Sequence, residues 1–288
     1  MPKIGIIGGS GVYKMGILKN TEEIDVDTPY GKPSDKLTLG SIQGIEVAFL
    51  PRHGRNHQHP PHKVNYRANI FAMKEVGVEY LLSTAAVGSL KKEIKPCDFV
   101  IAKQLIDRTN KRANTFFDEG ITVHVGFADP FCKKLSDVAY DTIKKEKLDV
   151  HRGTYICMEG PQFSTRAESN LYRSWDVDVI GMTLASEAKL AREAEICLCG
   201  ILSVTDYDCW YDEDVTVTSV VENLKKNDKN LANIITKLIP DVKYKRTCVC
   251  HNALENSIIT PSDFVQKNIN PQISRTPVSY THLTLPTN

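Results

Sequence analysis

Short apolar runs alternate along the chain with segments whose apolar residues recur at helical spacing. The apolar runs predict buried strands at residues 4–7, 47–50, 80–85, 99–106, 155–158, 177–182 and 196–205. Periodicity and composition predict helices at residues 66–76, 133–147, 165–175, 187–195 and 218–238. Because strands and helices alternate and several strands are apolar throughout, we expect an α/β fold. A central mixed sheet would be flanked by helices on both faces.

The predicted elements form one unit. The sequence contains no internal repeat and no clear linker before Pro240, so a single domain over residues 1–265 is the simplest division of the 288 residues. Residues 266–288 are rich in Thr, Pro and Ser and have no periodicity. They predict a loose C-terminal tail, for which a non-native origin stays open.

Composition narrows the function classes. Hydrophobic residues make up 41% of the chain and charged residues 25%, which is typical of a soluble globular protein. A net charge of +1 gives no broad attraction to nucleic acid or to an anionic membrane. The sequence has no signal-peptide pattern and no apolar run near the ~20 residues that span a bilayer. We expect a cytoplasmic protein, with a nuclear location left open.

The eight cysteines are expected to be mostly reduced and buried, as in other large cytosolic chains. Two Cys-x-Cys pairs occur, at 197/199 and at 248/250. In an extended strand the first pair would share one buried face. A CxxC…CxxC array is absent, which argues against a zinc ribbon, and we expect no metal.

Residues that suit an oxyanion follow four predicted strands. Residues 8–11 (Gly-Gly-Ser-Gly) can form a nest of backbone N–H groups, and Arg52 and His53 follow the strand that Pro51 ends. Residues 84–89 are predicted to form a loop of small residues after the third strand, and residues 182–183 (Met-Thr) end the fourth. Since ligands bind at strand ends in α/β proteins, the set predicts a site for inorganic phosphate. Neither the dinucleotide fingerprint nor the Walker pattern is satisfied.

Two carboxylates close the predicted strand at 196–205. If the strand persists, Asp206 and Asp208 point to the same side. A carboxylate accepts a hydrogen bond from an exocyclic amino group, and a protonated one donates to a ring nitrogen, so the pair suits a planar heterocycle. An exposed loop or helix cap is the alternative. No neighbouring Asn, Glu or His completes an oxygen cage for a metal.

Four histidines crowd residues 53–62, at positions 53, 57, 59 and 62. The pattern His57-x-His59 could be taken for a metal motif, but Pro60 and Pro61 forbid a regular helix and no H-E-x-x-H pattern exists. We expect His59 and His62 to be solvated.

Six segments occur together in a characteristic order. They are IIGGSG (6–11), PRHGR (51–55), HKVNYRAN (62–69), EGPQFSTRAE (159–168), GMT (181–183) and TDYDCW (205–210). Over about residues 3–262 the chain resembles the 5'-methylthioadenosine phosphorylase family of the purine nucleoside phosphorylase superfamily. The resemblance implies one α/β domain, assembled as a homotrimer. It also implies phosphorolysis of methylthioadenosine to adenine and 5-methylthioribose 1-phosphate, a step of purine and methionine salvage, with phosphate as co-substrate and no cofactor.

The resemblance also implies roles for individual residues. Arg52, His53 and Asp206 would be catalytic. Asp206 would share a proton with N7 of the leaving purine as a neutral acid, and Asp208 would assist through the amino group or a water. Phosphate would be held by Ser10, Arg52, His53, Ala85, Ala86 and Thr183. Further substrate contacts would come from Phe163, Ser164, Met182, His57, Val217, Val220 and Val221, and from His124 of a neighbouring subunit.

Departures from the family pattern leave alternatives open. Ala85 stands where relatives often have Thr or Asn, so one phosphate contact is in doubt. Relatives that prefer inosine or guanosine carry Asn in place of Asp206, so we expect adenine to be preferred. A phosphorylase for 6-oxopurine nucleosides or methylthioinosine, a nucleoside hydrolase and a catalytically idle nucleoside-binding protein stay as alternatives. The pair Cys248/Cys250 resembles one that can form a disulfide in some microbial relatives; reduced thiols are expected here.

Overall fold

The computed structural model describes residues 1–9, 16–118, 120–211, 217–242, 246–261 and 264, without the side chains of 217–221. Ser10 and the predicted tail at 266–288 lie outside the described residues. The domain limit at residue 265 therefore stays a prediction.

In the described part of the chain, nine strands form one sheet in the order β2-β3-β4-β1-β5-β8-β7-β6-β9. Their bounds are β1 Ile4–Gly8, β2 Lys19–Ile24, β3 Leu37–Ile42, β4 Ile45–Pro51, β5 Tyr80–Ser89, β6 Phe99–Asp107, β7 Val150–Cys157, β8 Val179–Gly181 and β9 Cys197–Asp206. Strand β9 also pairs with β5, so the last five strands in this order close into a ring. Parallel and antiparallel pairs both occur, which confirms the predicted mixed sheet.

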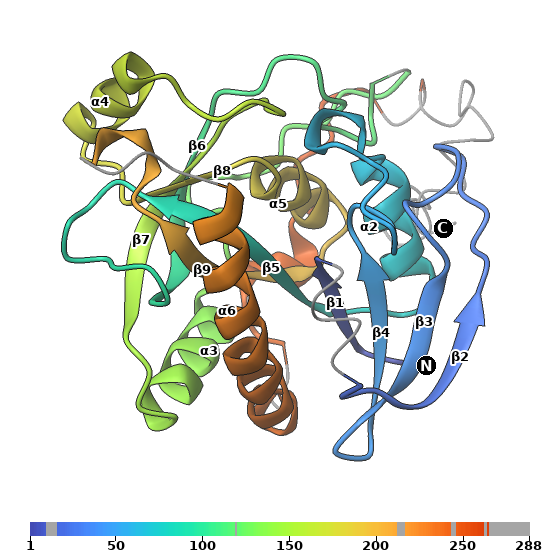
Figure 1. The fold of residues 1–288 in the computed structure, drawn as a ribbon. Helices are drawn as coiled ribbons and strands as arrows, with labels where there is room; N and C mark the ends of the chain where they lie inside the picture. Colours follow the sequence, from blue (N-terminus) through green and yellow to red (C-terminus); the bar gives the residue numbers. More distant parts are fainter. Residues whose placement is uncertain (10–15, 119, 212–216, 243–245, 262–263, 265–288) are drawn as a thin grey trace.

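Helices cover the two faces of the sheet, as predicted. Helices α2 and α5 pack into one apolar core and α3 and α6 into another (Figure 1). The bounds are α2 Tyr66–Glu75, α3 Lys133–Lys145, α4 Arg166–Ser174, α5 Leu184–Glu193 and α6 Val217–Leu238. Within the described ranges there are also four 3-10 turns: η1 Pro61–Lys63, η2 Asp208–Trp210, η3 Ile239–Asp241 and η4 Val249–Asn252. Helix α4 starts with the predicted capping box, in which Thr165 and Glu168 bond each other's backbone N–H.

The structure differs from the predicted elements in three places: the predicted loop at residues 84–89, and the strands β2 and β3, which were not predicted. Residues 84–89 are the second half of β5, not a loop, because their backbone groups pair with β9 up to the Gly88–Asp206 pair. Tertiary pairing here outweighs the low strand propensity of small residues. The sequence also gave no signal for β2, an edge strand with five exposed residues out of six and hence no apolar face.

The register of the sheet brings two predicted anion-binding segments together. Strands β1 and β4 are parallel, and Gly8 lies opposite Pro51. The backbone N–H of Arg52 donates to the Gly8 carbonyl at 2.9 Å. The chain therefore leaves both strands at the same edge of the sheet.

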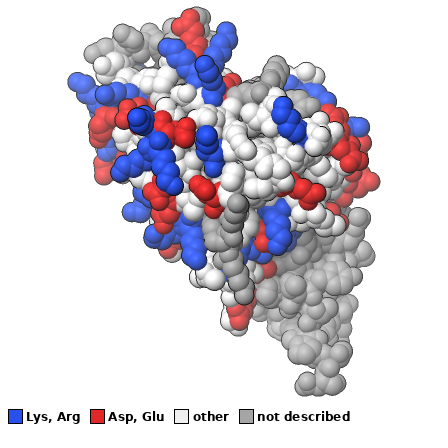
Figure 2. Space-filling view, turned by 90° about the horizontal axis from the view of Figure 1, so that it is seen from below, with Lys and Arg blue, Asp and Glu red and all other residues white. Residues whose placement is uncertain are grey.

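Charged side chains of both signs lie on the face of the molecule that Figure 2 draws. Figure 2 shows Lys/Arg and Asp/Glu side chains mixed on the face that it draws, in agreement with the net charge of +1. Among the described residues, no helix combines the length and apolar character needed to cross a membrane.

Candidate active site

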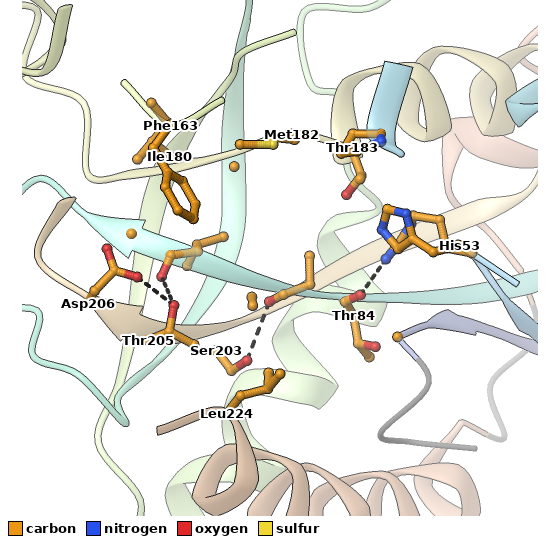
Figure 3. A pocket seen from close by; sticks show the side chains of 18 of the residues that line it. His53, Thr84, Phe163, Ile180, Met182, Thr183, Ser203, Thr205, Asp206 and Leu224 are labelled. Atoms are coloured by element: carbon orange, nitrogen blue, oxygen red, sulfur yellow. Dashed lines mark hydrogen bonds between the residues drawn. The ribbon is translucent and has the colours of Figure 1, made fainter. Parts of the chain in front are cut away.

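A cavity of about 330 Å³ lies where β1 and β4 end, along the inner strands β5 and β9 (Figure 3). Ten of the residues predicted to bind phosphate or substrate line it: Arg52, His53, His57, Ala85, Ala86, Phe163, Met182, Thr183, Asp206 and Asp208. Gly9, Thr84, Val87 and Gly88, from the segments predicted to surround the anion, line it as well. The sequence reasoning did not single out the lining residues Pro61, Met158, Ile180, Ser203, Leu224, Asp228 and Leu231. Most of these residues are apolar or lie in a predicted helix, and nothing in the sequence distinguishes them from other residues of that kind. Only the fold shows that they line the cavity.

Arg52 is a buried side chain that is 2% exposed. Its Nε and Nη2 donate to the Glu187 carboxylate at 2.5 and 3.1 Å, and its Nη1 donates to the Thr84 carbonyl at 2.8 Å. At most one N–H of Nη1 is left for a ligand. The charge of Arg52 is thus neutralised by Glu187 within the protein. The sequence suggested that the whole guanidinium group is available to an oxyanion, and the structure does not have this arrangement.

Glu187, the partner of Arg52, was not singled out from the sequence. It lies on α5, is completely buried, and also accepts a 2.5 Å hydrogen bond from the Ser83 hydroxyl. A buried carboxylate needs a paired charge. The signal available in the sequence was that this acidic residue stands in a helical segment, Leu184–Glu193, that is rich in Leu and Ala.

His53 is neutral at physiological pH. Burial and the Arg52 charge lower its pKa to about 4. Its Nδ1 lies 2.8 Å from the His59 carbonyl, which can only accept, so the hydrogen is on Nδ1 and Nε2 is an acceptor. The ring stacks on His57 at 4.5 Å between centroids. His53 can therefore accept a hydrogen bond from a ligand O–H, where the sequence had suggested a donor.

Thr183 supplies a buried hydroxyl that has no hydrogen-bond partner among the described residues. It is the N-cap of α5, and its backbone N–H donates to the Tyr155 hydroxyl at 3.1 Å. An unsatisfied buried hydroxyl costs about 1–3 kcal/mol, and a helix N-terminus attracts anions. Figure 3 shows Thr183 at the same end of the cavity as His53 and Thr84. We name this the anion end.

Asp206 lies at the opposite end of the cavity, which we name the acid end (Figure 3). Asp208 also lines the cavity and is hydrogen-bonded to Asp206. The condition under which both side chains would point to the same side, a strand that continues to residue 208, is not met. Strand β9 ends at Asp206, and Asp208 begins η2 with a φ of 51°. A register shift after Val87 leaves Thr205 as an extra residue, and such a bulge re-aims the side chains beside it.

Hydrogen bonds join the two acids. The Asp208 backbone N–H donates to Asp206 Oδ1 at 2.8 Å, and the Thr205 hydroxyl donates to Oδ2 at 2.7 Å. Burial raises the pKa of Asp206 and that of Asp208 above their usual range, and the Asp208 charge raises that of Asp206 further. Asp208 Oδ2 is buried with no partner among the described residues. These carboxyls can therefore hold a proton and bind a donor.

The wall between the two ends is apolar. Phe163, Ile180 and Met182 line it, and Phe163 is 55% exposed although it is aromatic. A large aromatic group at a cavity mouth gives a flat ligand a surface to stack on.

Not every predicted contact lies in the cavity. Ser164 does not line it, and its carbonyl accepts from the Cys209 thiol at 3.2 Å. His124 is exposed and away from the cavity lining. Val217, Val220 and Val221 belong to α6, but their side chains lie outside the described residues, as does Ser10.

The fold and the cavity define a class: an α/β protein with a small-molecule site at its strand ends, anion-binding at one end and acidic at the other. The chain belongs to the phosphorylase superfamily, whose family model matches residues 3–240. Its relatives include the S-methyl-5'-thioadenosine phosphorylases of Koribacter versatilis, 52% identical over 91% of each chain, and of Pyrococcus horikoshii, 49% identical over 90% of this chain and 100% of the other.

Solved structures agree with this assignment. A methylthioadenosine phosphorylase from an antarctic soil metagenomic library superimposes with a TM-score of 0.91, 41% identity and 99% coverage of both chains. The enzyme of Schistosoma mansoni in complex with adenine gives a TM-score of 0.83 at 34% identity, over 88% of this chain and 96% of the other. The family and the nucleoside phosphorylase fold predicted from the sequence are confirmed.

Proposed function

We propose that this chain catalyses phosphorolysis of S-methyl-5'-thioadenosine to adenine and 5-methylthioribose 1-phosphate, with inorganic phosphate as co-substrate. Relatives with about half of their residues identical carry this name. The observation that carries the proposal is the two-ended cavity, which offers an unsatisfied hydroxyl at one end and proton-holding carboxyls at the other. The substrate's chemistry needs both, because phosphate attacks the sugar on one side while the purine leaves on the other.

At the anion end, phosphate would accept hydrogen bonds from Thr183 Oγ1 and from the remaining Arg52 N–H, with Ser10 and the Ala85–Ala86 backbone as further contacts. His53 would accept from a phosphate O–H. A phosphate oxygen then bonds to C1' as the C1'–N9 bond breaks. The ribosyl cation that develops is stabilised by the phosphate charge and by fixed orientation.

At the acid end, the electron pair of the broken bond passes into the purine. Asp206, whose pKa is raised by burial, would share a proton with N7, and Asp208 would assist at the amino group directly or through a water. Phe163 would stack on the base and Met182 would contact the ribose. The slot for the methylthio group would be formed by Val217, Val220, Val221, His57 and a neighbour's His124; Ser164 would support the base pocket.

The assembly is proposed to be a homotrimer, as the family resemblance implies. His124 does not line the cavity of its own chain, and in this proposal it would serve the cavity of a neighbouring copy. His124 is exposed, and its backbone N–H donates to the Ser257 carbonyl at 2.9 Å, which fixes its segment against the C-terminal residues. Light scattering should give a molar mass near three times 32.2 kDa. A monomer with full activity would contradict this assembly.

The function is tested by adenine or hypoxanthine release from methylthioadenosine, adenosine, inosine and methylthioinosine, each with and without phosphate. We expect release that requires phosphate and is fastest with methylthioadenosine. Phosphate-independent release would indicate a hydrolase, and faster release from inosine or methylthioinosine would indicate a 6-oxopurine enzyme. Nucleoside binding without any release would indicate an idle binding protein.

Replacing Thr183 by valine is expected to raise the KM for phosphate about tenfold or more, because a hydrogen bond to a charged group contributes about 1.5–3 kcal/mol. Steady-state rates over a range of phosphate concentrations check this. Thermal stability should not fall, since the hydroxyl has no protein partner to lose. Thr142→Val, a buried threonine on α3 away from the cavity, should leave the phosphate KM unchanged. An unchanged KM in Thr183→Val would remove this residue from the phosphate site.

A further inference from the structure

Four cysteines from distant parts of the chain meet at one point outside the cavity. Cys132 is the N-cap of α3, Cys197 begins β9, and Cys248 and Cys250 belong to the C-terminal segment around η4. All four Sγ atoms lie within 4.8 Å of one another. Cys132, Cys197 and Cys250 are buried and Cys248 is half-buried. The sequence could not reveal this cluster, because only one Cys-x-Cys pair within it is local.

Two of the six sulfur–sulfur separations are close to those of a tetrahedral thiolate site, and none exceeds 4.8 Å. Cys248 Sγ lies 3.4 Å from Cys197 Sγ and 3.8 Å from Cys132 Sγ. Four sulfurs bound to one Zn²⁺ at about 2.3 Å are about 3.8 Å apart. In a disulfide the two sulfur atoms are about 2.05 Å apart. The sulfur atoms would therefore have to move much less to bind one metal ion than to form a disulfide bond.

The backbone holds these side chains in place. The Cys132 N–H donates to the Leu198 carbonyl at 2.8 Å, and the Cys197 N–H donates to the Glu79 carbonyl at 2.9 Å. Cys132 caps a helix of thirteen residues, whose N-terminal dipole favours thiolate over thiol. His251 Nδ1 lies 2.6 Å from the Cys248 carbonyl, which orients the Cys-x-Cys turn. Such supporting contacts are what a metal site needs around its ligands.

We propose that Cys132, Cys197, Cys248 and Cys250 form a structural site for a soft, tetrahedral divalent metal ion, with zinc as the expected occupant. Binding converts four thiols and Zn²⁺ into one tetrathiolate complex and releases four protons to solvent. No oxidant or reductant is required. The site is closed, since all four positions are protein ligands, and it has no role in the proposed reaction.

The metal would fix the C-terminal segment to the sheet. That segment continues to Ile258, which bridges to Val123, and Ile259 N–H donates to the Thr122 carbonyl at 2.9 Å. Pinning Cys248 and Cys250 to α3 and β9 therefore also anchors the strand-like pairing beside His124. We expect metal removal to destabilise this region first.

The experiment measures zinc in the full chain, purified under reducing conditions, by elemental analysis. We expect about one zinc per chain in the wild type. The double variant Cys248→Ser/Cys250→Ser should lose it. Cys97→Ser, whose cysteine lies outside the cluster, should retain it. A strong chelator should lower the midpoint of thermal unfolding of the wild type and of Cys97→Ser.

Reconstitution keeps the test valid if the double variant does not fold. Wild-type protein stripped by chelator and reductant is titrated with Co²⁺, which should give the intense visible bands of tetrahedral thiolate coordination and saturate at about one ion per chain. No bands together with eight reactive thiols would overturn the proposal in favour of simple thiol packing. A mass lower by two hydrogens per cysteine pair, with no metal, would overturn it in favour of disulfides.

Discussion

Asp206→Asn is expected to lower the ratio of kcat/KM for methylthioadenosine to kcat/KM for inosine by about 10²-fold or more. While one oxygen of the Asp206 carboxyl shares a proton with N7, the other can accept from the 6-amino group beside Asp208. An amide at this position presents an N–H that suits a 6-oxo group. Initial rates with both nucleosides at saturating phosphate measure the ratio. Because asparagine cannot supply the acidic proton to N7, the absolute kcat with methylthioadenosine should also fall, by about 10²- to 10⁴-fold.

The local structure makes this substitution interpretable. Oδ1 can still accept from the Asp208 N–H, and the Thr205 hydroxyl can turn to accept from the new amide. Asp35→Asn is a matched control, since Asp35 binds Arg55 away from the cavity lining and its replacement should leave the ratio unchanged. An unchanged ratio in Asp206→Asn would mean that another group distinguishes the two purines.

The sequence predicted most elements because burial and periodicity coincide in them. Strands β1, β4 and β9 are largely apolar and are buried over most of their length. Strand β2 could not be predicted, since an exposed edge strand satisfies its backbone by pairing alone and needs no apolar face. The pattern of apolar residues in a short segment therefore indicates which elements are buried. It does not indicate an exposed strand that is stabilised by hydrogen bonds to the neighbouring strand.

The candidate site was predicted as a set of residue types, while its electrostatics came only from the structure. The sequence did not predict an ion pair for Arg52, because its partner Glu187 is 135 residues away on another element. The free hydroxyl of Thr183 likewise depends on the absence of an acceptor near it, which no local spacing encodes. The bulge at Thr205 changed the relation between Asp206 and Asp208 for the same reason, since register is a property of two strands.

The buried ion pair of Arg52 and Glu187 gives the second large effect. Glu187→Gln is expected to lower the free energy of unfolding by about 3–5 kcal/mol, because it leaves the guanidinium charge buried without a counter-charge. For a chain of this size each kcal/mol lowers the unfolding midpoint by about 2–4 °C, and thermal unfolding followed by circular dichroism measures it. The side chains are 2% and 0% exposed, so solvent cannot compensate.

Two comparisons show whether the missing charge is the cause. Asp118→Asn removes the partner of Arg67 in a half-exposed pair and should cost about 1 kcal/mol or less. Added phosphate should raise the midpoint of Glu187→Gln more than that of the wild type, because an anion at the anion end would replace the lost carboxylate. If Glu187→Gln unfolds at the wild-type midpoint, the charge of Arg52 is balanced by other groups, and its link to the anion end is not electrostatic.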